Sequence, residues 1–146
     1  MAWNDEVGLL AATLRSLSIR QGARELGIER GFDRWVALAR KLKLRRGTVY
    51  LIGNGASASM ASHYAADLAK NARLHTEVFS DLSLITAISN DMGYEHVFEE
   101  PLRRRARKGD MLIAISSFGR SPNVLKAVRL ARRLGLTVVT LSGRSP

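Results

Sequence analysis

From residue 47 onward, short and continuous apolar runs alternate with segments of helical periodicity. The apolar runs are Thr48–Ile52, Met111–Ile115 and Thr137–Leu141, with Thr76–Ser80 as a fourth. Unbroken apolar strands are typical of a parallel sheet that is buried on both faces. Helical patterns lie between the runs, at about 57–71, 94–107 and 122–134. The sequence therefore predicts a three-layer α/β sandwich with a parallel β-sheet.

Two amphipathic helices are predicted before this alternation. Apolar residues recur at helical spacing in 3–20 and in 30–46, and glycines separate the two segments. A chain of this length can bury roughly 70% of its unfolded surface, so one domain is expected over 1–146. Residues 47–146 would form the α/β core. The apolar face of 1–46 needs a partner surface, either within the domain or on another subunit, so we expect an oligomerisation segment there.

Composition excludes several classes of protein. The chain has no cysteine, which excludes a disulfide scaffold, a thiolate zinc finger and a cysteine nucleophile. No apolar run approaches the roughly 18–20 residues of a membrane span. Asp5 and Glu6 stand where a signal peptide would be basic. We therefore expect a cytoplasmic protein without a membrane partner.

The chain is strongly basic, with 23 Lys and Arg residues, 13 Asp and Glu residues and a formal net charge of +10. One interpretation is nucleic-acid binding, because basic surfaces attract phosphate by counterion release. The other is that cations coat solvated helix faces and helix C-termini. Arg103–Arg105, followed by Arg107 and Lys108, fits a helix end, and no aromatic residue interrupts this run. The sequence thus favours helix ends over nucleic acid.

Two loops that follow predicted strands have the composition of anion-binding loops. Gly53–Ser59 combines glycines with a helix start, and Ser116–Asn123 combines three serines with a glycine and a proline. Either loop alone could be a capped tight turn. Two of them at the carboxyl ends of parallel strands favour a phosphate or sugar-phosphate site. Neither matches a dinucleotide fingerprint or a P-loop.

Polar side chains suited to chemistry lie near these loops. His63 and Asp67 are four residues apart on a predicted helix and share one face, so they could ligate a metal or act as an acid–base pair. A hydrogen-bonded surface pair is the alternative. Asn90 and Asp91 could bind sugar hydroxyls or form an Asx turn. His75 and His96 are expected to be structural.

Three motifs together resemble the sugar isomerase (SIS) domain, and most closely its phosphoheptose isomerase branch. They are Gly53-Asn54-Gly55-Ala56-Ser57, Asn90-Asp91 with Gly93-Tyr94, and Ile115–Ala127. The resemblance implies a flavodoxin- or Rossmann-like fold with a five-stranded parallel sheet, and a homo-oligomer, usually a tetramer, with shared active sites. It also implies conversion of sedoheptulose 7-phosphate to glycero-manno-heptose 7-phosphate through an enediol, for the heptose of bacterial surface polysaccharide.

The same resemblance implies roles for individual residues. Ser116, Ser117 and Ser121 would hold the phosphate. The sugar would contact Asn54, Ser57, Asn90 and Asp91. His63 falls on a zinc-ligand position of the family, and Asp67 falls where the family usually has a catalytic glutamate. Both would act in catalysis and hold Zn²⁺.

The sequence also departs from the family pattern. Asp67 is one methylene shorter than glutamate, Phe118 replaces a hydroxyl residue, and the family's last strand and C-terminal helix have no counterpart here. In the family that helix brings a catalytic histidine and a glutamine. Two functions therefore remain open: a phosphosugar isomerase, or a non-catalytic SIS module that binds a sugar phosphate or a protein partner.

Overall fold

The computed structural model of the protein describes residues 3–143 and contains two compact units, Met1–Lys41 and Leu42–Pro146. The first unit holds helix α1 (Trp3–Arg15), a hairpin of β1 (Arg20–Gln21) and β2 (Arg24–Glu25), and most of helix α2 (Ile28–Leu44). The two predicted helices are confirmed: α1 starts at residue 3 as predicted and ends five residues earlier, and α2 is shifted by two residues at each end. The hairpin was not predicted, because its strands are short and exposed and carry no apolar pattern.

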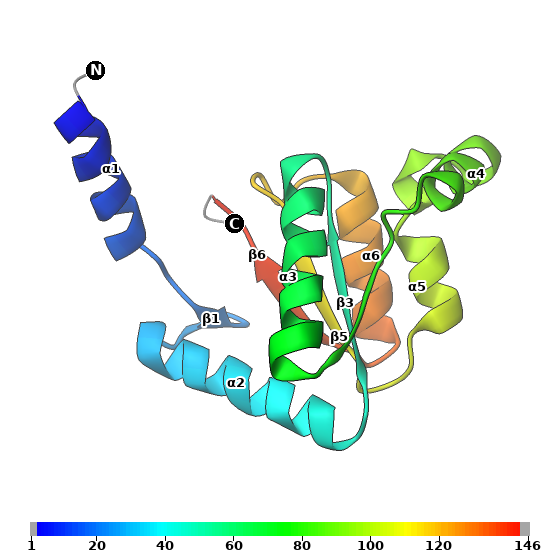
Figure 1. Ribbon diagram of the computed structural model, residues 1–146, viewed down its shortest axis with the longest axis horizontal. Helices are drawn as coiled ribbons and strands as arrows, with labels where there is room; N and C mark the ends of the chain where they lie inside the picture. The colour runs from blue at the N-terminus through cyan, green and yellow to red at the C-terminus, as the bar shows by residue number, and fades with distance from the viewer. Residues whose placement is uncertain (1–2, 144–146) are drawn as a thin grey trace. The chain divides into compact units, whose positions relative to one another are not determined.

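The second unit is built on a four-stranded parallel sheet in the order β4-β3-β5-β6 (Figure 1). Its strands are β3 (Thr48–Gly53), β4 (His75–Val78), β5 (Met111–Ile115) and β6 (Thr137–Leu141). All five residues of β5 are buried, as expected of a strand covered on both faces. The predicted α/β fold is confirmed. The described residues contain four parallel strands, where the family resemblance implied five.

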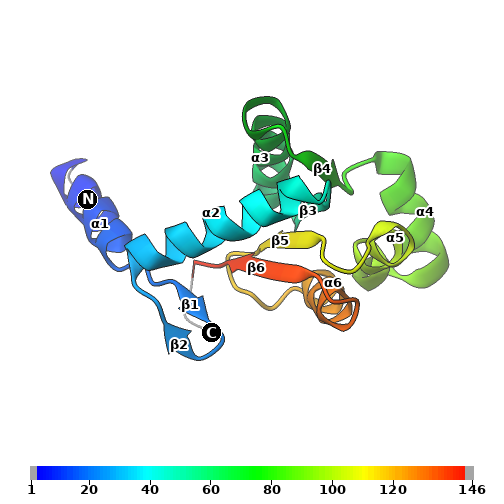
Figure 2. The ribbon, with the colours of Figure 1, turned by 90° about the horizontal axis from the view of Figure 1, so that it is seen from below.

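Helices cover both faces of this sheet (Figure 2). Helix α3 (Ala56–Ala72) lies on one face, and helices α5 (Glu99–Arg105) and α6 (Pro122–Arg133) lie on the other. Helix α4 (Leu82–Met92), capped by the Asp81 side chain, was not predicted. The predicted helix at 94–107 is instead a 3-10 turn, η1 (Tyr94–His96), followed by α5.

The main core lies between the sheet and α6. Leu112 of β5 and Leu102 of α5 are fully buried. Ala127 and Ala131, one turn apart on α6, have no exposed surface, so their small side chains bring the helix close to the strands. On the other face, Ala61 and Ala65 do the same for α3. Close packing of these small residues therefore holds α3 and α6 against the sheet.

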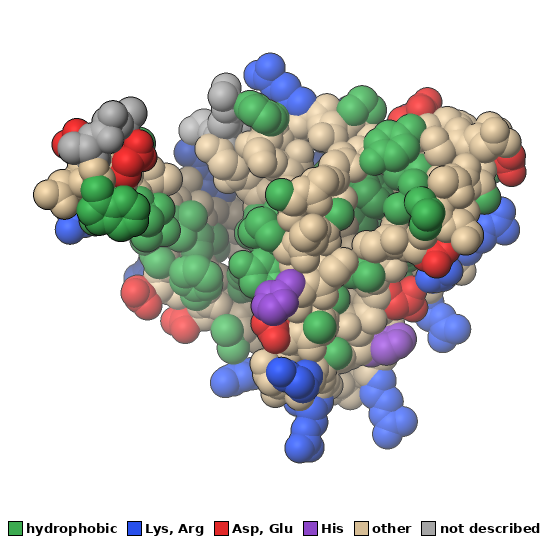
Figure 3. All heavy atoms as spheres, turned by 45° about the horizontal axis from the view of Figure 1, so that its top comes forward, with side chains coloured by type: hydrophobic (Ala, Val, Ile, Leu, Met, Phe, Trp, Pro, Cys, Tyr) green, Lys and Arg blue, Asp and Glu red, His purple; other side chains and the backbone are tan. Residues whose placement is uncertain are grey.

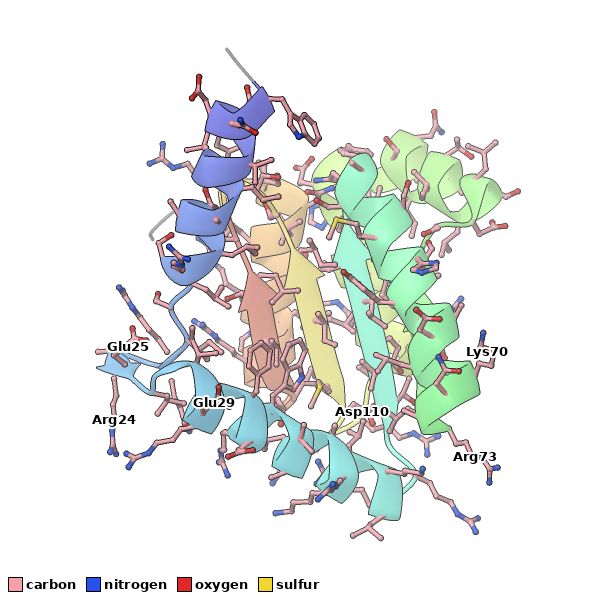
Figure 4. The ribbon with its side chains drawn as sticks, turned by 60° about the vertical axis from the view of Figure 1, so that its left-hand side comes forward. Arg24, Glu25, Glu29, Lys70, Arg73 and Asp110 are labelled. Carbon is pink, nitrogen blue, oxygen red and sulfur yellow. The ribbon has the colours of Figure 1, made fainter. Side chains whose placement is uncertain are left out.

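A buried carboxylate secures the amino ends of the strands. Asp110 is 7% exposed, and its two oxygens accept hydrogen bonds from the backbone N–H groups of Thr48, at 3.0 Å, and Arg107, at 2.8 Å. Its own carbonyl accepts from Thr137 N–H at 2.8 Å. Figure 4 shows Asp110 at the end of the sheet opposite the tips of the strand arrows. Asp110, through its side chain and its backbone carbonyl, therefore joins the starts of β3, β5 and β6.

Tyr50 makes the stability of the fold sensitive to alkaline pH. Its ring is 2% exposed and stacks on Phe79 with the ring centroids 5.7 Å apart. Burial, reinforced by the charges of Glu77 and Asp110, raises the pKa of Tyr50 from 10.0 to about 12. The raised pKa contributes stability that is complete below pH 10 and is lost as pH rises towards 12, because only the unfolded chain ionises there. We expect a loss of about 2–3 kcal/mol in the free energy of unfolding from this group.

Denaturant unfolding at pH 9 and pH 11.5 measures this effect. Tyr50→Phe removes the ionising hydroxyl and keeps the ring, so its free energy of unfolding should fall less between the two pH values than that of the unaltered protein. Tyr64→Phe is the matched control, since Tyr64 is 44% exposed. Equal alkaline losses in the unaltered protein and in Tyr50→Phe would contradict the prediction.

Large apolar side chains remain at the surface of both units. Among them are Trp3, Leu10 and Leu14 of α1, which are 60–79% exposed, and Met60 and Tyr64 of α3, which are each 44% exposed. Apolar side chains are visible at the surface in Figure 3. No helix among residues 3–143 has both the length and the apolar content needed to cross a membrane.

Candidate functional site

The two ligand-type loops leave the sheet side by side. β3 and β5 are neighbours, and their last residues, Gly53 and Ile115, are paired in register. The chain after β3 enters α3 on one face of the sheet, whereas the chain after β5 enters α6 on the other face (Figure 2). The two loops therefore lead to opposite faces of the sheet and begin side by side at the carboxyl ends of neighbouring strands. This is the usual place for a ligand in an open α/β sheet.

The β3–α3 loop is a tight turn that leads directly into a helix. Gly55 has φ 54°, and a Cβ built on it would meet nothing within 4 Å. Asn54 and Gly55 offer their carbonyls to Ser57 N–H and Ala58 N–H, at 3.0 and 2.9 Å. The loop thus presents open backbone next to the N-terminus of α3, where an anion is favoured.

Among residues 3–143, no side-chain hydrogen bond engages the three serine hydroxyls of the β5–α6 loop. Its turn is closed by the Gly119 N–H, which donates to Ser116 O at 3.1 Å. Ser121 occupies the N-cap position of α6 with extended backbone, and Pro122 follows at N1, but the Ser121 side chain makes no capping hydrogen bond. Ser116 and Ser121 are half-buried, and Ser117 is exposed. The three hydroxyls, next to the positive end of the α6 helix dipole, can therefore serve a bound anion.

A pair of asparagines joins the two loops. Asn54 Nδ2 donates to Asn123 Oδ1 at 3.0 Å, and Asn123 Nδ2 donates back to Asn54 Oδ1 at 2.9 Å. Asn123 Oδ1 also accepts from Val124 N–H at 2.9 Å, and Asn123 is only 1% exposed. The two loops are therefore fixed relative to each other by a buried and reciprocal amide pair.

Tyr94 extends this network towards a pocket. Its hydroxyl donates to Asn54 Oδ1 at 3.2 Å. Both residues line a pocket of about 210 Å³ with Gly53, Ser80 and Phe98. Asn54 Oδ1 is then engaged by two donors, and Asn54 keeps one free N–H for a ligand. Of the residues expected to contact the sugar, Asn54 is the one that lines this pocket.

His63 and Asp67 lie together on the outer face of α3. His63 Nε2 is 3.3 Å from Asp67 Oδ2, and the two side chains are 76% and 43% exposed. Asp67 follows Ala56 by eleven residues, which corresponds to about 16 Å along the helix at 1.5 Å per residue. Neither residue lines the pocket at Asn54. The structure brings this pair together but does not bring it to the loops.

The pair fits half of a metal site. Two ligands of one tetrahedral zinc ion, each about 2.0–2.1 Å from the metal, lie about 3.3 Å apart, which matches the His63–Asp67 separation. Imidazole and carboxylate are both ligands that zinc accepts. Among residues 3–143, however, no group of three or more His, Cys, Asp or Glu side chains is placed to hold a metal. Two further ligands would have to come from elsewhere.

Asn90 and Asp91 lie at the end of α4, and neither lines the pocket at Asn54. Asn90 Nδ2 donates to Asp91 Oδ1 at 2.9 Å, and both residues are exposed. Asp91 lines a second pocket, of about 300 Å³, with Glu100, Arg104 and Arg105. The other two histidines have partners within the fold: His75 with the Thr48 hydroxyl, and His96 with Glu99 and Lys126.

Two residues of the site, Asn123 and Tyr94, were not assigned a role from the sequence. Asn123 did carry a signal, since it stands second in a helix that begins with proline, where asparagine has poor helix propensity but can bond the local backbone. Tyr94 is 53% exposed, and its one signal was its place in the Gly93-Tyr94 part of the family motif.

Comparison with known proteins gives a consistent result. The SIS domain family model matches residues 31–143. The phosphoheptose isomerase of Nitratidesulfovibrio vulgaris is 38% identical over 130 residues, which are 83% of this chain and 62% of the relative. That of Helicobacter pylori strain Shi470 is 44% identical over 105 residues, or 68% of this chain and 55% of the relative. The chain thus spans about three fifths of the length of these relatives.

Solved structures agree with the fold. The structure of a Neisseria gonorrhoeae phosphoheptose isomerase matches with a TM-score of 0.71 at 33% identity, over 99% of this chain and 77% of that one. A phosphoheptose isomerase from Francisella tularensis, at 22% identity, shares the fold with a TM-score of 0.78 over 97% of this chain and 76% of that one. The chain therefore belongs to the SIS domain family and resembles its phosphoheptose isomerases.

Proposed function

We propose that this protein is a phosphosugar aldose–ketose isomerase that acts between sedoheptulose 7-phosphate and glycero-manno-heptose 7-phosphate. The β5–α6 loop carries the proposal. No side-chain hydrogen bond within the described residues engages its three serine hydroxyls. The Asn54–Asn123 pair holds this loop, called the serine loop below, next to the β3–α3 loop. Relatives named phosphoheptose isomerase support the choice of sugar.

In this proposal the serine loop anchors the phosphate. Ser116, Ser117 and Ser121 donate hydroxyl hydrogen bonds, and the N-terminus of α6 adds the positive end of its helix dipole. The anchor is remote from the reacting carbons, so it orients the sugar without taking part in the chemistry. The free N–H of Asn54 and the Ser57 hydroxyl contact the sugar, as do Asn90 and Asp91.

Asp67 and His63 carry out the proton transfer. Isomerisation moves a proton between adjacent carbons through an enediol, which requires a base at carbon and an acid at oxygen. Asp67 is the proposed base, and His63, 3.3 Å away, exchanges the proton at oxygen. Both side chains face outward on α3, so a second subunit covers them in the proposed homo-oligomer, a dimer or tetramer. The exposed apolar residues of α1 and α3 support such an assembly.

His63 and Asp67 would also hold Zn²⁺, as two of its four ligands. When bound, zinc would supply positive charge that stabilises the negative charge developing on the substrate oxygen. The proposed substrate is a phosphorylated sugar, so the proposed place of action is the cytoplasm. The proposed product would serve the heptose of a bacterial surface polysaccharide.

Deuterium exchange tests the proposed reaction. The purified chain is incubated with sedoheptulose 7-phosphate in heavy water, with and without zinc, and the C1 and C2 positions are followed by NMR. We expect deuterium uptake and a new aldose signal. Asp67→Asn should slow the exchange by roughly 100- to 10,000-fold, which is the usual range for loss of a general base.

Asp33→Asn is the matched control, because Asp33 is an exposed carboxylate on α2. Equal exchange rates in Asp67→Asn and Asp33→Asn would contradict the role of Asp67. Saturable binding of the sugar phosphate with no exchange in the unaltered chain would favour the second candidate, a non-catalytic SIS module. The observation that favours a non-catalytic module is that His63 and Asp67 are exposed and do not line the pocket at Asn54.

A further inference from the structure

Positive charge gathers at the amino ends of the strands, opposite the proposed ligand site. Helices α3 and α6 each run back to the start of the next strand, so their last turns lie at this end together with the segments before β3 and β5. We call this surface the amino-end face. Its exposed cations are Lys43, Arg45, Arg46, Lys70, Arg73, Arg107, Lys108 and Arg132.

Hydrogen bonds hold these segments next to one another. Lys43 Nζ donates to Ala72 O at 2.7 Å, which joins the end of α2 to the end of α3. The Arg45 guanidinium donates to Gly109 O, and Gly109 N–H donates to Gly135 O at 3.0 Å. In Figure 4, Lys70 and Arg73 lie at the end of α3 that is close to the start of the sheet. The cations therefore share one surface.

This charge is not neutralised locally. In α5, by contrast, Arg103, Arg104 and Arg105 each form an ion pair with a glutamate at 2.6–3.1 Å. The segments 43–47, 70–74 and 106–110 contain a single carboxylate, Asp110, which is buried and bonded to backbone N–H groups. Within the described residues, no ion pair to an acid engages any cation of the amino-end face.

Favourable interaction with helix dipoles does not account for all of these cations. Arg46 and Arg73 have φ 55° and 54°, in the left-handed region, which glycine adopts at lower cost than arginine. Arg107 and Lys108 lie in the connection between α5 and β5, outside any helix. Arginine is therefore present at two positions where local backbone energetics prefer glycine. The charge itself is the property that these positions supply.

We propose that the amino-end face binds the phosphate backbone of duplex nucleic acid without sequence preference. Cations spread over several elements match a phosphate array, and their binding releases counterions. The segments of this face contain no aromatic residue, so bases of a single strand have no stacking platform. Leu44, which is 88% exposed, is the one large exposed apolar side chain in these segments, and a membrane surface requires an apolar face.

The test is fluorescence anisotropy of a labelled 25-base-pair duplex titrated with the full chain at increasing salt. The variant Arg46→Gly/Arg73→Gly/Arg107→Gln removes three cations of the face, and glycine suits the backbone at the first two positions. The control Arg15→Gln/Arg24→Gln/Arg34→Gln lowers the net charge equally with exposed arginines of the other unit. We expect the first variant to bind roughly tenfold or more weakly at low salt. Its logarithmic salt slope should be shallower by about 2–3, at about 0.9 per phosphate contact.

The control should bind like the unaltered chain. Equal weakening in both triple variants would overturn the proposal, because total charge and not the amino-end face would then govern binding. Absence of duplex binding at low salt would also overturn it. Sedimentation with vesicles of phosphatidylglycerol and phosphatidylcholine, at matched phosphate concentration, provides the remaining comparison: tighter binding to vesicles than to duplex would identify a membrane as the partner and overturn the proposal.

Discussion

Replacement of Asn123 by alanine is expected to lower the free energy of unfolding by about 3 kcal/mol. Asn123 is 1% exposed, and its amide makes three hydrogen bonds, two with Asn54 and one with Val124 N–H. Alanine would leave the Asn54 amide and the Val124 N–H short of partners. An orphaned buried polar group costs about 1–3 kcal/mol, and more than one is affected here.

The same substitution should loosen the two loops. In the proposed enzyme Asn123 is a positioning residue, since it contacts Asn54 and the α6 backbone rather than substrate. We therefore expect weaker binding of the sugar phosphate, and faster hydrogen exchange of the Asn54 side-chain amide measured by NMR. Denaturant unfolding measures the stability loss.

Asn71→Ala is the matched control for Asn123→Ala. Asn71 is an exposed asparagine on α3, where alanine has the better helix propensity, so its stability should change by no more than about 0.5 kcal/mol. A stability loss in Asn123→Ala no larger than that of the control would show that the amide pair does not hold the loops together.

The fold was largely predictable because the strands have continuous apolar sequences, which are typical of a buried sheet. β5 and β6 have the predicted ends, and in β5, which is buried along its whole length, a continuous apolar run is expected. Helix α4 was missed because its N-cap residue, Asp81, follows the predicted strand end Ser80 directly and resembles a loop residue. The predicted helix at 94–107 divides because Pro101, in the first turn of α5, has no N–H to continue the helical hydrogen bonds from η1.

The site was predictable at its loops and less so beyond them. Glycine and serine spacing indicated the two loops, because a backbone turn at a helix start requires particular residue types locally. The Asn54–Asn123 pair joins residues 69 apart in the chain, and only the strand order brings them together. For the same reason, spacing alone could not show that Asp67 and Asp91 lie away from the pocket at Asn54.

Gly53→Ala is expected to destabilise the fold by at least about 3 kcal/mol and to abolish binding at the loops. A Cβ at Gly53 would lie 2.7 Å from the carbonyl carbon, the carbonyl oxygen and the Cβ of Ser57. Two of these atoms are backbone in the first turn of α3, so no side-chain rotation relieves the contact. The helix would have to shift away from β3, which disturbs both the buried face of α3 and the loop between them.

Gly55→Ala measures the cost of an unfavourable backbone conformation without a steric clash. Gly55 has φ 54°, but a Cβ there would meet nothing within 4 Å. Alanine should therefore cost only the conformational penalty, about 1–2 kcal/mol. Denaturant unfolding of both variants, with titration of sedoheptulose 7-phosphate into each, measures the difference. If the two alanines cost the same, close packing of β3 against α3 is not what requires glycine at position 53. A larger loss at Gly53 would show that the absence of a side chain there allows the start of α3 to pack against β3 and form the loop.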